Sequence, residues 1–183
     1  MRALILLLAS FFAATAHGAD LETLVFRSIN SVRASHGLSA LSGNPQLAVA
    51  ARSQSLWMAS VGRMEHMRPA ARSFDEFLSC EYHPSNRVVK SGYFKFEELF
   101  RIERNPTGAT VFPLPAANEK VGEIIARGVG GPGAYDHRTV VRGWMNSPGH
   151  RKEILKAPYR EMGVSVVSPR NGETYWCVVF GYK

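Results

Sequence analysis

Apolar residues recur at helical spacing in residues 20–36, which predicts an amphipathic helix near the start of the chain. Asp20 stands where an N-terminal cap is expected, and Gly37 follows the last turn, where helices commonly end. The apolar face of this helix consists of Leu21, Leu24, Val25, Ile29 and Val32.

A second helix is predicted over residues 45–61. Asn44 is a suitable N-cap, Pro45 fits the first helical position, and Gly62 marks the end. Its face toward the core is expected to carry Leu47, Ala51, Gln54, Met58 and Val61.

The pattern changes to a period of two in residues 121–126, which predicts a strand before a glycine-rich turn at 128–133. Two more strands are predicted at 162–167 and 173–182, joined by a turn that contains Asn171-Gly172. The last strand is apolar on both faces, so helices should cover both sides of the sheet. We therefore expect an α+β fold built as a three-layer α-β-α sandwich.

A third helix is predicted between these strands. Asp136 is its expected cap, Pro148 its end, and a short helical turn follows at residues 151–155. Its apolar face consists of Val140, Val141, Trp144 and Met145.

Residues 67–118 show no clear period. They contain too many large apolar side chains for a disordered linker, so we interpret them as an insertion packed onto the domain. A short helix at residues 94–101 and a loop through Pro113 and Pro115 are expected within it.

Residues 1–18 have the features of a secretory signal peptide, with a positive start, an apolar run of about 12 residues and small residues before a cleavage site after Gly18. This run is shorter than the roughly 20 residues that span a membrane, so no transmembrane segment is expected. The remainder, residues 19–183, is expected to form a single domain in a secreted or periplasmic protein.

The chain carries 22 Lys and Arg against 15 Asp and Glu, a formal net charge of +7. Basic and acidic residues are interleaved and no nucleic-acid-binding motif is present, so we exclude a nucleic-acid binder. The charge suits solubility and attraction to an anionic envelope surface, in a protein expected to be a monomer.

The two cysteines leave two interpretations open. In an oxidising compartment Cys80 and Cys177 are candidates for a disulfide. Because Cys177 lies between Trp176 and Val178, it is equally well explained as a small apolar core residue.

Three residues are candidates for chemistry by their position: His66 beyond a helix-ending glycine, Glu123 on a strand, and His150 at a helix start. A carboxylate among apolar neighbours either needs a partner or lies in solvent at a sheet edge. Two imidazoles and a carboxylate suit a divalent metal, zinc first, and they equally suit acid-base work.

Other polar residues have plainer explanations. His83 is the alternative to His66 if the insertion is misplaced, and Ser147, near His150, lacks the strained turn of a hydrolase nucleophile. Residues expected to be solvated or to lie at helix ends are Glu65, Glu153, His36 and His137. The tryptophans expected in the core are Trp57, Trp144 and Trp176.

Several segments together carry a family resemblance. The most specific is residues 144–155, with the sequence WMNSPGHRKEIL, and Arg87 with Gly92-Tyr93 echoes an intervening segment. The other segments are residues 28–41, 57–66, 121–125, 162–164 and 175–181. They resemble the bacterial branch of the CAP superfamily, which covers cysteine-rich secretory, antigen 5 and pathogenesis-related proteins and is also called the SCP domain.

The resemblance implies a mainly antiparallel central sheet and a cleft lined by two histidines and acidic residues, often holding a divalent metal. His66, Glu123 and His150 fall on the matching positions. Ile124 replaces the usual asparagine after the glutamate, and Ser147 aligns with the second glutamate of eukaryotic members. A triad with weaker metal affinity is therefore expected, under an insertion that caps or reshapes the cleft.

Two classes of function follow from these expectations. The first is an exported binding module whose cleft takes Zn²⁺ or another divalent cation and a small-molecule or lipid ligand, without an assured reaction. The second is a metal-dependent hydrolase of peptides or esters that uses the same cleft. The sequence leaves open whether the protein is an enzyme.

Overall fold

The computed structural model describes residues 21–69, 76, 81–106, 108–129, 136–169 and 171–183. The signal peptide expected at residues 1–18, the cap at Asp20, Cys80 and most of the glycine-rich turn lie outside the described residues.

A four-stranded sheet forms the middle layer, in the order β1 (Ser42–Gly43), β5 (Glu161–Val167), β6 (Glu173–Gly181) and β4 (Val121–Val129). Strands β4 and β5 both run antiparallel to β6, whereas the short β1 is parallel to β5. The sheet is thus mixed, with antiparallel pairing along its long strands.

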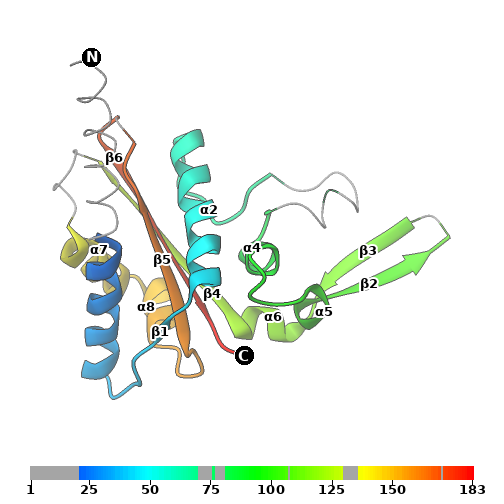
Figure 1. The fold of residues 1–183 in the computed structure, drawn as a ribbon, viewed down its shortest axis with the longest axis horizontal. Coiled ribbons are helices and arrows are strands. Elements are labelled where there is room, and N and C mark those ends of the chain that lie inside the picture. The colour runs from blue at the N-terminus through cyan, green and yellow to red at the C-terminus, as the bar shows by residue number, and fades with distance from the viewer. Residues whose placement is uncertain (1–20, 70–75, 77–80, 107, 130–135, 170) are drawn as a thin grey trace, which may run out of the picture.

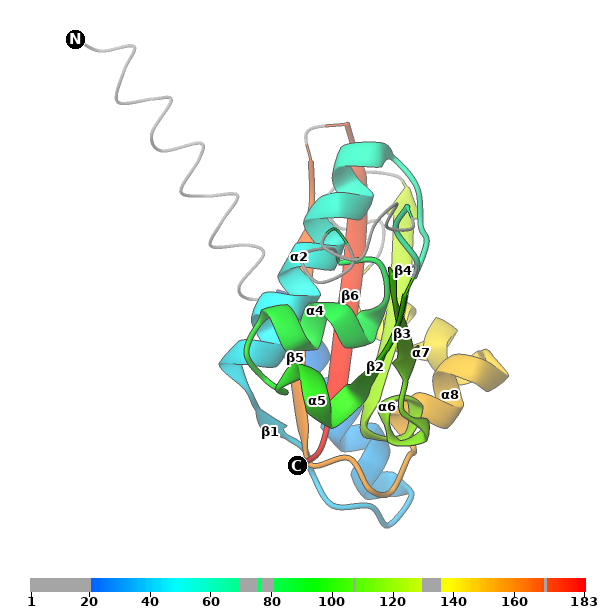
Figure 2. The same cartoon turned by 90° about the vertical axis from the view of Figure 1, so that its right-hand side faces the viewer.

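Helices cover both faces of this sheet, as Figures 1 and 2 show. The helix at residues 21–35, α7 (His137–Asn146) and α8 (Pro148–Ile154) lie on one face. The other face carries α2 (Pro45–Val61), α4 (Pro84–Lys90), α5 (Phe96–Leu99) and α6 (Pro115–Lys120). The α-β-α sandwich expected from the sequence is confirmed.

Strand β6 contributes to two separate hydrophobic cores. Tyr175, Cys177 and Val179 pack toward α2 and α4, in a core with Leu47 and Met58. The alternate residues Trp176, Val178 and Phe180 pack into the other core, beside the helix at 21–35, α7 and α8. This two-sided burial explains why the strand is apolar at nearly every position.

The structure confirms the residues predicted to begin and end the second helix, α2. The Asn44 side chain accepts hydrogen bonds from the backbone N–H groups of Gln46 and Leu47, and Pro45 opens α2. Gly62 ends the helix at a φ of 67°, in the left-handed region that glycine adopts without strain.

The insertion differs from its expected form. The helix predicted at residues 94–101 is only the four-residue α5, because Phe100 begins a strand. Strands β2 (Phe100–Asn105) and β3 (Gly108–Pro113) form an antiparallel hairpin where a loop was expected. Much of this hairpin is exposed, so its sequence lacks the apolar face that would have revealed it.

The start of α8 also differs from the prediction. This helix begins at Pro148 rather than at residue 151, since proline suits the first helical turn.

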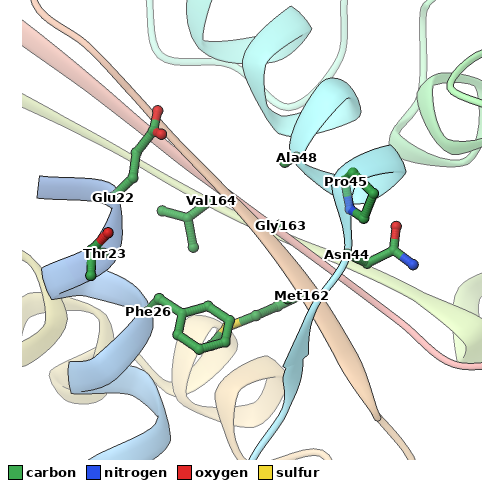
Figure 3. A pocket seen from close by; sticks show the side chains of 10 residues that line it. Glu22, Thr23, Phe26, Asn44, Pro45, Ala48, Met162, Gly163 and Val164 are labelled. Carbon is green, nitrogen blue, oxygen red and sulfur yellow. The ribbon is translucent and has the colours of Figure 1, made fainter. Parts of the chain in front are cut away.

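Gly163 brings β5 directly under α2. A Cβ atom at this position would lie 2.0 Å from the backbone nitrogen of Ala48, so only glycine fits without a shift of backbone. Figure 3 shows the adjoining pocket between the helix at 21–35 and α2, with Phe26, Met162 and Val164 around it. Close packing here fixes α2, and with it the loop that follows Gly62.

Within the described part of the chain, no helix is both long enough and apolar enough to cross a membrane.

Candidate functional site

Glu123 lies on β4, the strand at one edge of the sheet, yet its side chain is only 1% exposed. One carboxylate oxygen lies 2.6 Å from Nη2 of Arg87, and the other lies 2.9 Å from Nδ1 of His66. The sequence left open whether this carboxylate is buried with a partner or lies in solvent at a sheet edge, and in the structure it is buried and paired.

Arg87 projects from α4 and is completely buried. Besides Glu123, its guanidinium donates to the backbone oxygens of Glu81, at 2.9 Å, and His66, at 3.1 Å. One side chain therefore neutralises the carboxylate and also fixes the backbone on which His66 stands.

The charged state of Glu123 follows from this pairing. Burial raises the pKa of the Glu123 carboxyl. The Arg87 charge and the hydrogen bonds from His66 and Arg87 lower it by more than burial raises it, so the pKa lies below its ordinary value. The carboxylate is ionised at neutral pH and can accept a hydrogen from each partner.

The loop after α2 is braced from a second side. The Gln54 side chain donates to the backbone oxygen of Glu65 at 2.6 Å. Arg68 donates to Gln54 and Ser53 of α2 and to Glu81 on the far side of the loop. These bonds hold residues 65–68 against α2.

His66 remains accessible despite this bracing, since its side chain is 43% exposed. Its Nδ1 faces the Glu123 carboxylate and carries the hydrogen of that bond, which leaves Nε2 as the ring nitrogen available to a ligand.

His150 stands on the first turn of α8 and is half-buried. Burial, and next the neighbouring His66, lowers the pKa of His150 below its ordinary value. The His150 imidazole is therefore neutral at neutral pH, the form that binds metals or accepts hydrogen bonds.

A cleft of about 270 Å³ opens at His150, between the edge of β4 and α7. Nε1 of Trp144 donates to the backbone oxygen of Ile125 at 2.9 Å and so ties α7 to β4 beside the cleft. The lining residues are Met64, Ile125, Ala126, Arg127, Thr139, Val140, Gly143, Trp144, Ser147 and His150. The lining thus combines apolar residues, such as Met64 and Trp144, with the polar residues Ser147 and His150.

The remaining predicted candidates have other roles. His83 caps α4, where its Nδ1 accepts the backbone N–H of Ser85, and it does not take the place of His66. Ser147 lines the cleft at the start of α8 but its hydroxyl makes no capping bond there.

Other polar residues lie at the surface or bond locally. Glu65 pairs with Arg63 in solvent, while Glu153 accepts a hydrogen bond from Tyr159. His36 bonds to Arg151, and His137 opens α7.

Cys177 is a free, buried thiol in the core beside α2. Burial, and next the charge of Glu123, raises the pKa of the Cys177 thiol. The structure thus has Cys177 as an unreactive core residue, while Cys80 lies outside the described residues.

Arg87 and Arg68 are the residues that sequence reasoning missed. Arg87 was noted only as part of a resemblance, and no local pattern around it in the sequence marks the arginine as buried. Across the described residues, no three His, Cys, Asp or Glu side chains converge in the manner of a metal site.

Comparison with known proteins gives one family match. The model of the cysteine-rich secretory protein family matches residues 26–180, which include every residue of the site. No curated protein matches the sequence closely.

Solved structures share the fold. An outer surface protein of Borrelia burgdorferi has a TM-score of 0.63 and 16% identity, covering 90% of this chain and 93% of that one. An extracellular SCP-domain protein of Bacillus anthracis has a TM-score of 0.62 and 20% identity, covering 91% of this chain and 41% of that one. A cysteine-rich secretory protein of Staphylococcus aureus has a TM-score of 0.52 and 19% identity, covering 91% of this chain and 40% of that one. This chain therefore spans less than half the length of the latter two proteins.

Proposed function

Because the chain belongs to the cysteine-rich secretory protein (CAP) family, we propose that it is an exported binding protein whose cleft beside His150 and His66 takes a small ligand. The observation that carries this proposal is the buried chain from Arg87 through Glu123 to His66. Burying the Arg87–Glu123 pair is costly, and here the pair fixes one half-exposed imidazole, that of His66. The ligand that suits the cleft has an apolar body, such as a lipid, and a polar end that meets the imidazoles.

Export is part of the same proposal. The structural relatives are described as an outer surface protein, an extracellular protein and a secretory protein. Together with the signal-peptide features of residues 1–18, this supports a secreted or periplasmic location.

A divalent metal fits only part of the predicted triad. Glu123 already has an ion-pair partner for each oxygen, so it is poorly suited to bind a metal directly. His66 and His150 remain as the two imidazoles that would hold Zn²⁺ or a similar cation. Glu123 would then orient His66 through Nδ1, the role that carboxylates commonly take behind metal-bound histidines.

Zinc titration by calorimetry tests this assignment. We expect uptake of one Zn²⁺ per chain, lost in His66→Ala and His150→Ala and weakened about 10–100-fold in Glu123→Gln, which removes the orienting charge. His137→Ala, outside the cleft, is the matched control. Equal uptake by all four variants, or none by the wild type, would exclude the metal.

The ligand cleft is tested separately by filling it. A Cβ atom added at Gly143 would meet no atom within 4 Å, and Gly143 lines the cleft, so Gly143→Leu should fold and block it. Gly149→Leu adds the same side chain in open space at a position that does not line the cleft. We expect an anilinonaphthalene sulfonate probe to bind the wild type and the Gly149 variant but not the Gly143 variant. Equal fluorescence from all three would contradict a ligand cleft at this place.

The contact between His66 and Glu123 also favours a second candidate, a metal-dependent hydrolase. A carboxylate that orients the imidazole of a metal-binding histidine raises the basicity of that ligand, and a divalent metal held by His66 and His150 would supply a nucleophilic water at neutral pH. Turnover of a peptide or ester panel that disappears in His66→Ala and His150→Ala, but not in His137→Ala, would establish this candidate. Absence of turnover by the zinc-loaded wild type would leave the binding protein.

A further inference from the structure

A second groove, of about 420 Å³, lies between the helix at 21–35 and α7. It shares no lining residue with the cleft at His150. The lining residues are Ser28, Ser31, Val32, Ser35, His36, Arg138, Val141, Arg142 and Met145. The groove therefore combines an apolar floor with polar walls.

The two walls carry different hydrogen-bond donors. Arg138 and Arg142 stand one turn apart on the exposed side of α7, so both guanidinium groups project over the same stretch of groove. Opposite them, Ser28, Ser31 and Ser35 recur at intervals of three and four along the other helix, which places their hydroxyls on one face.

Four of these donors have no hydrogen-bond partner in the part of the chain that the structure describes. Among the residues that the structure describes, neither the guanidinium groups of Arg138 and Arg142 nor the hydroxyls of Ser28 and Ser31 make a hydrogen bond or an ion pair. The nearby carboxylate of Asp136 accepts the backbone N–H of Thr139 at 2.7 Å as the cap of α7. The hydrogen bonds from Thr139, and after them the charges of His137 and Arg138, lower the pKa of Asp136, so within the described chain Arg138 has one acidic neighbour but no ion pair at contact distance.

One end of the groove has a third cation. Nδ1 of His36 lies 2.9 Å from the backbone oxygen of Val32 and donates to it, so Nε2 is the acceptor for Arg151 at 3.1 Å. His36 thus holds the Arg151 guanidinium beside the groove.

We propose that this groove binds a phosphate group through Arg138 and Arg142 on one wall and the hydroxyls of Ser28 and Ser31 on the other, since the Ser35 hydroxyl already donates to the backbone oxygen of Val32. A guanidinium fork matches two phosphate oxygens, and a tetrahedral oxyanion has further oxygens for the opposite wall, whereas a planar carboxylate has only two. The apolar floor of Val32, Val141 and Met145 accepts an uncharged part of the ligand. This site is independent of the proposed cleft function.

Two probes test the groove and distinguish the source of the phosphate. The first is inorganic phosphate, titrated by calorimetry against chloride at matched ionic strength. The second is sedimentation with phosphatidylcholine vesicles that contain or lack phosphatidic acid. Both use the wild type, the double variant R138Q/R142Q, the single variant Ser31→Glu, and the control R52Q/R101Q, which removes two exposed charges from outside the groove.

We expect R138Q/R142Q and Ser31→Glu to weaken binding at least about tenfold, because each lost charge-assisted hydrogen bond contributes appreciably to affinity. The control should bind like the wild type. Binding of inorganic phosphate points to a soluble phosphate, and binding only to phosphatidic acid vesicles points to a lipid headgroup. No binding to either probe, or equal losses in R138Q/R142Q and R52Q/R101Q, overturns the proposal.

Discussion

At the scale of single residues, the site depends on the buried Arg87, which no sequence motif predicted. The spacing of apolar neighbours around Glu123 predicted that a buried carboxylate would need a partner, and His66 was named as part of its surroundings. Arg87 was not predicted as that partner, because 36 residues separate it from Glu123 and only the packing of α4 on β4 brings them together.

Removing this cation should destabilise the fold. Arg87→Met leaves Glu123 buried without its charge partner, and we expect the free energy of unfolding to fall by about 3–5 kcal/mol. Urea denaturation measures the change, with the exposed Arg52→Met as the control. The double variant Arg87→Met with Glu123→Leu should recover part of the loss. An unfolding midpoint unchanged in Arg87→Met would show that the buried pair does not support the structure.

A second residue-scale prediction concerns pH. Burial raises the pKa of Glu81, but hydrogen bonds from Lys90 and Ser53 and the Arg68 charge outweigh it, so the folded pKa lies below the ordinary value of 4.5. A lowered folded pKa contributes stability that is complete above the unfolded value and is lost as the pH falls through the folded one. The stability difference between wild type and Glu81→Gln should therefore be constant near neutral pH and shrink below pH 4.5.

Stability curves for the two proteins across this range measure that difference. The exposed Glu97→Gln serves as the control and should follow the wild type throughout. A difference that grows toward acid pH would have the wrong sign for a stabilising carboxylate.

At the scale of elements, the sequence predicted the helix ends correctly where capping residues determine them. Asn44, Pro45 and Gly62 fixed the ends of α2, and Asp136 fixed the start of α7. The hairpin of β2 and β3 escaped prediction because pairing between strands, rather than burial of one face, holds it together. Its exposed residues gave no period to detect.

The contact between α2 and β5 gives a prediction at this scale. Gly163→Ala puts a methyl group within 2.0 Å of backbone atoms of α2, so the helix must move, and we expect a loss of about 3 kcal/mol or more. Gly149→Ala, in open space on α8, should instead be neutral or gain up to about 1 kcal/mol. Thermal and urea unfolding of both variants provide the comparison. Equal stability of the two would contradict the close approach of β5 and α2.

At the scale of the whole molecule, the pattern of the strand β6 was enough to predict the three layers. The alternation that made both faces of β6 apolar predicted helices on two sides, and the two cores confirm it. The position of the cleft could not be predicted in the same way, since it depends on how α7, α8 and the loop after α2 meet at β4.

Export yields a prediction for the whole chain. If residues 1–18 are a signal peptide, the protein recovered from outside the cytoplasm should begin at Ala19, as intact mass and N-terminal sequencing would show. Replacing apolar residues of the 3–14 run with arginine should retain the full-length form in the cytoplasm. A full-length exported protein that begins at Met1 would contradict cleavage after Gly18.

The central place of β6 also sets the order of folding. Every other helix and strand that the structure describes precedes β6 in sequence, yet both hydrophobic cores need its side chains. Neither core can close while the chain is still emerging, so the nascent polypeptide stays in an open, threadable state until its final strand arrives. If residues 1–18 direct export as proposed, this delay keeps the chain unfolded while it crosses a membrane.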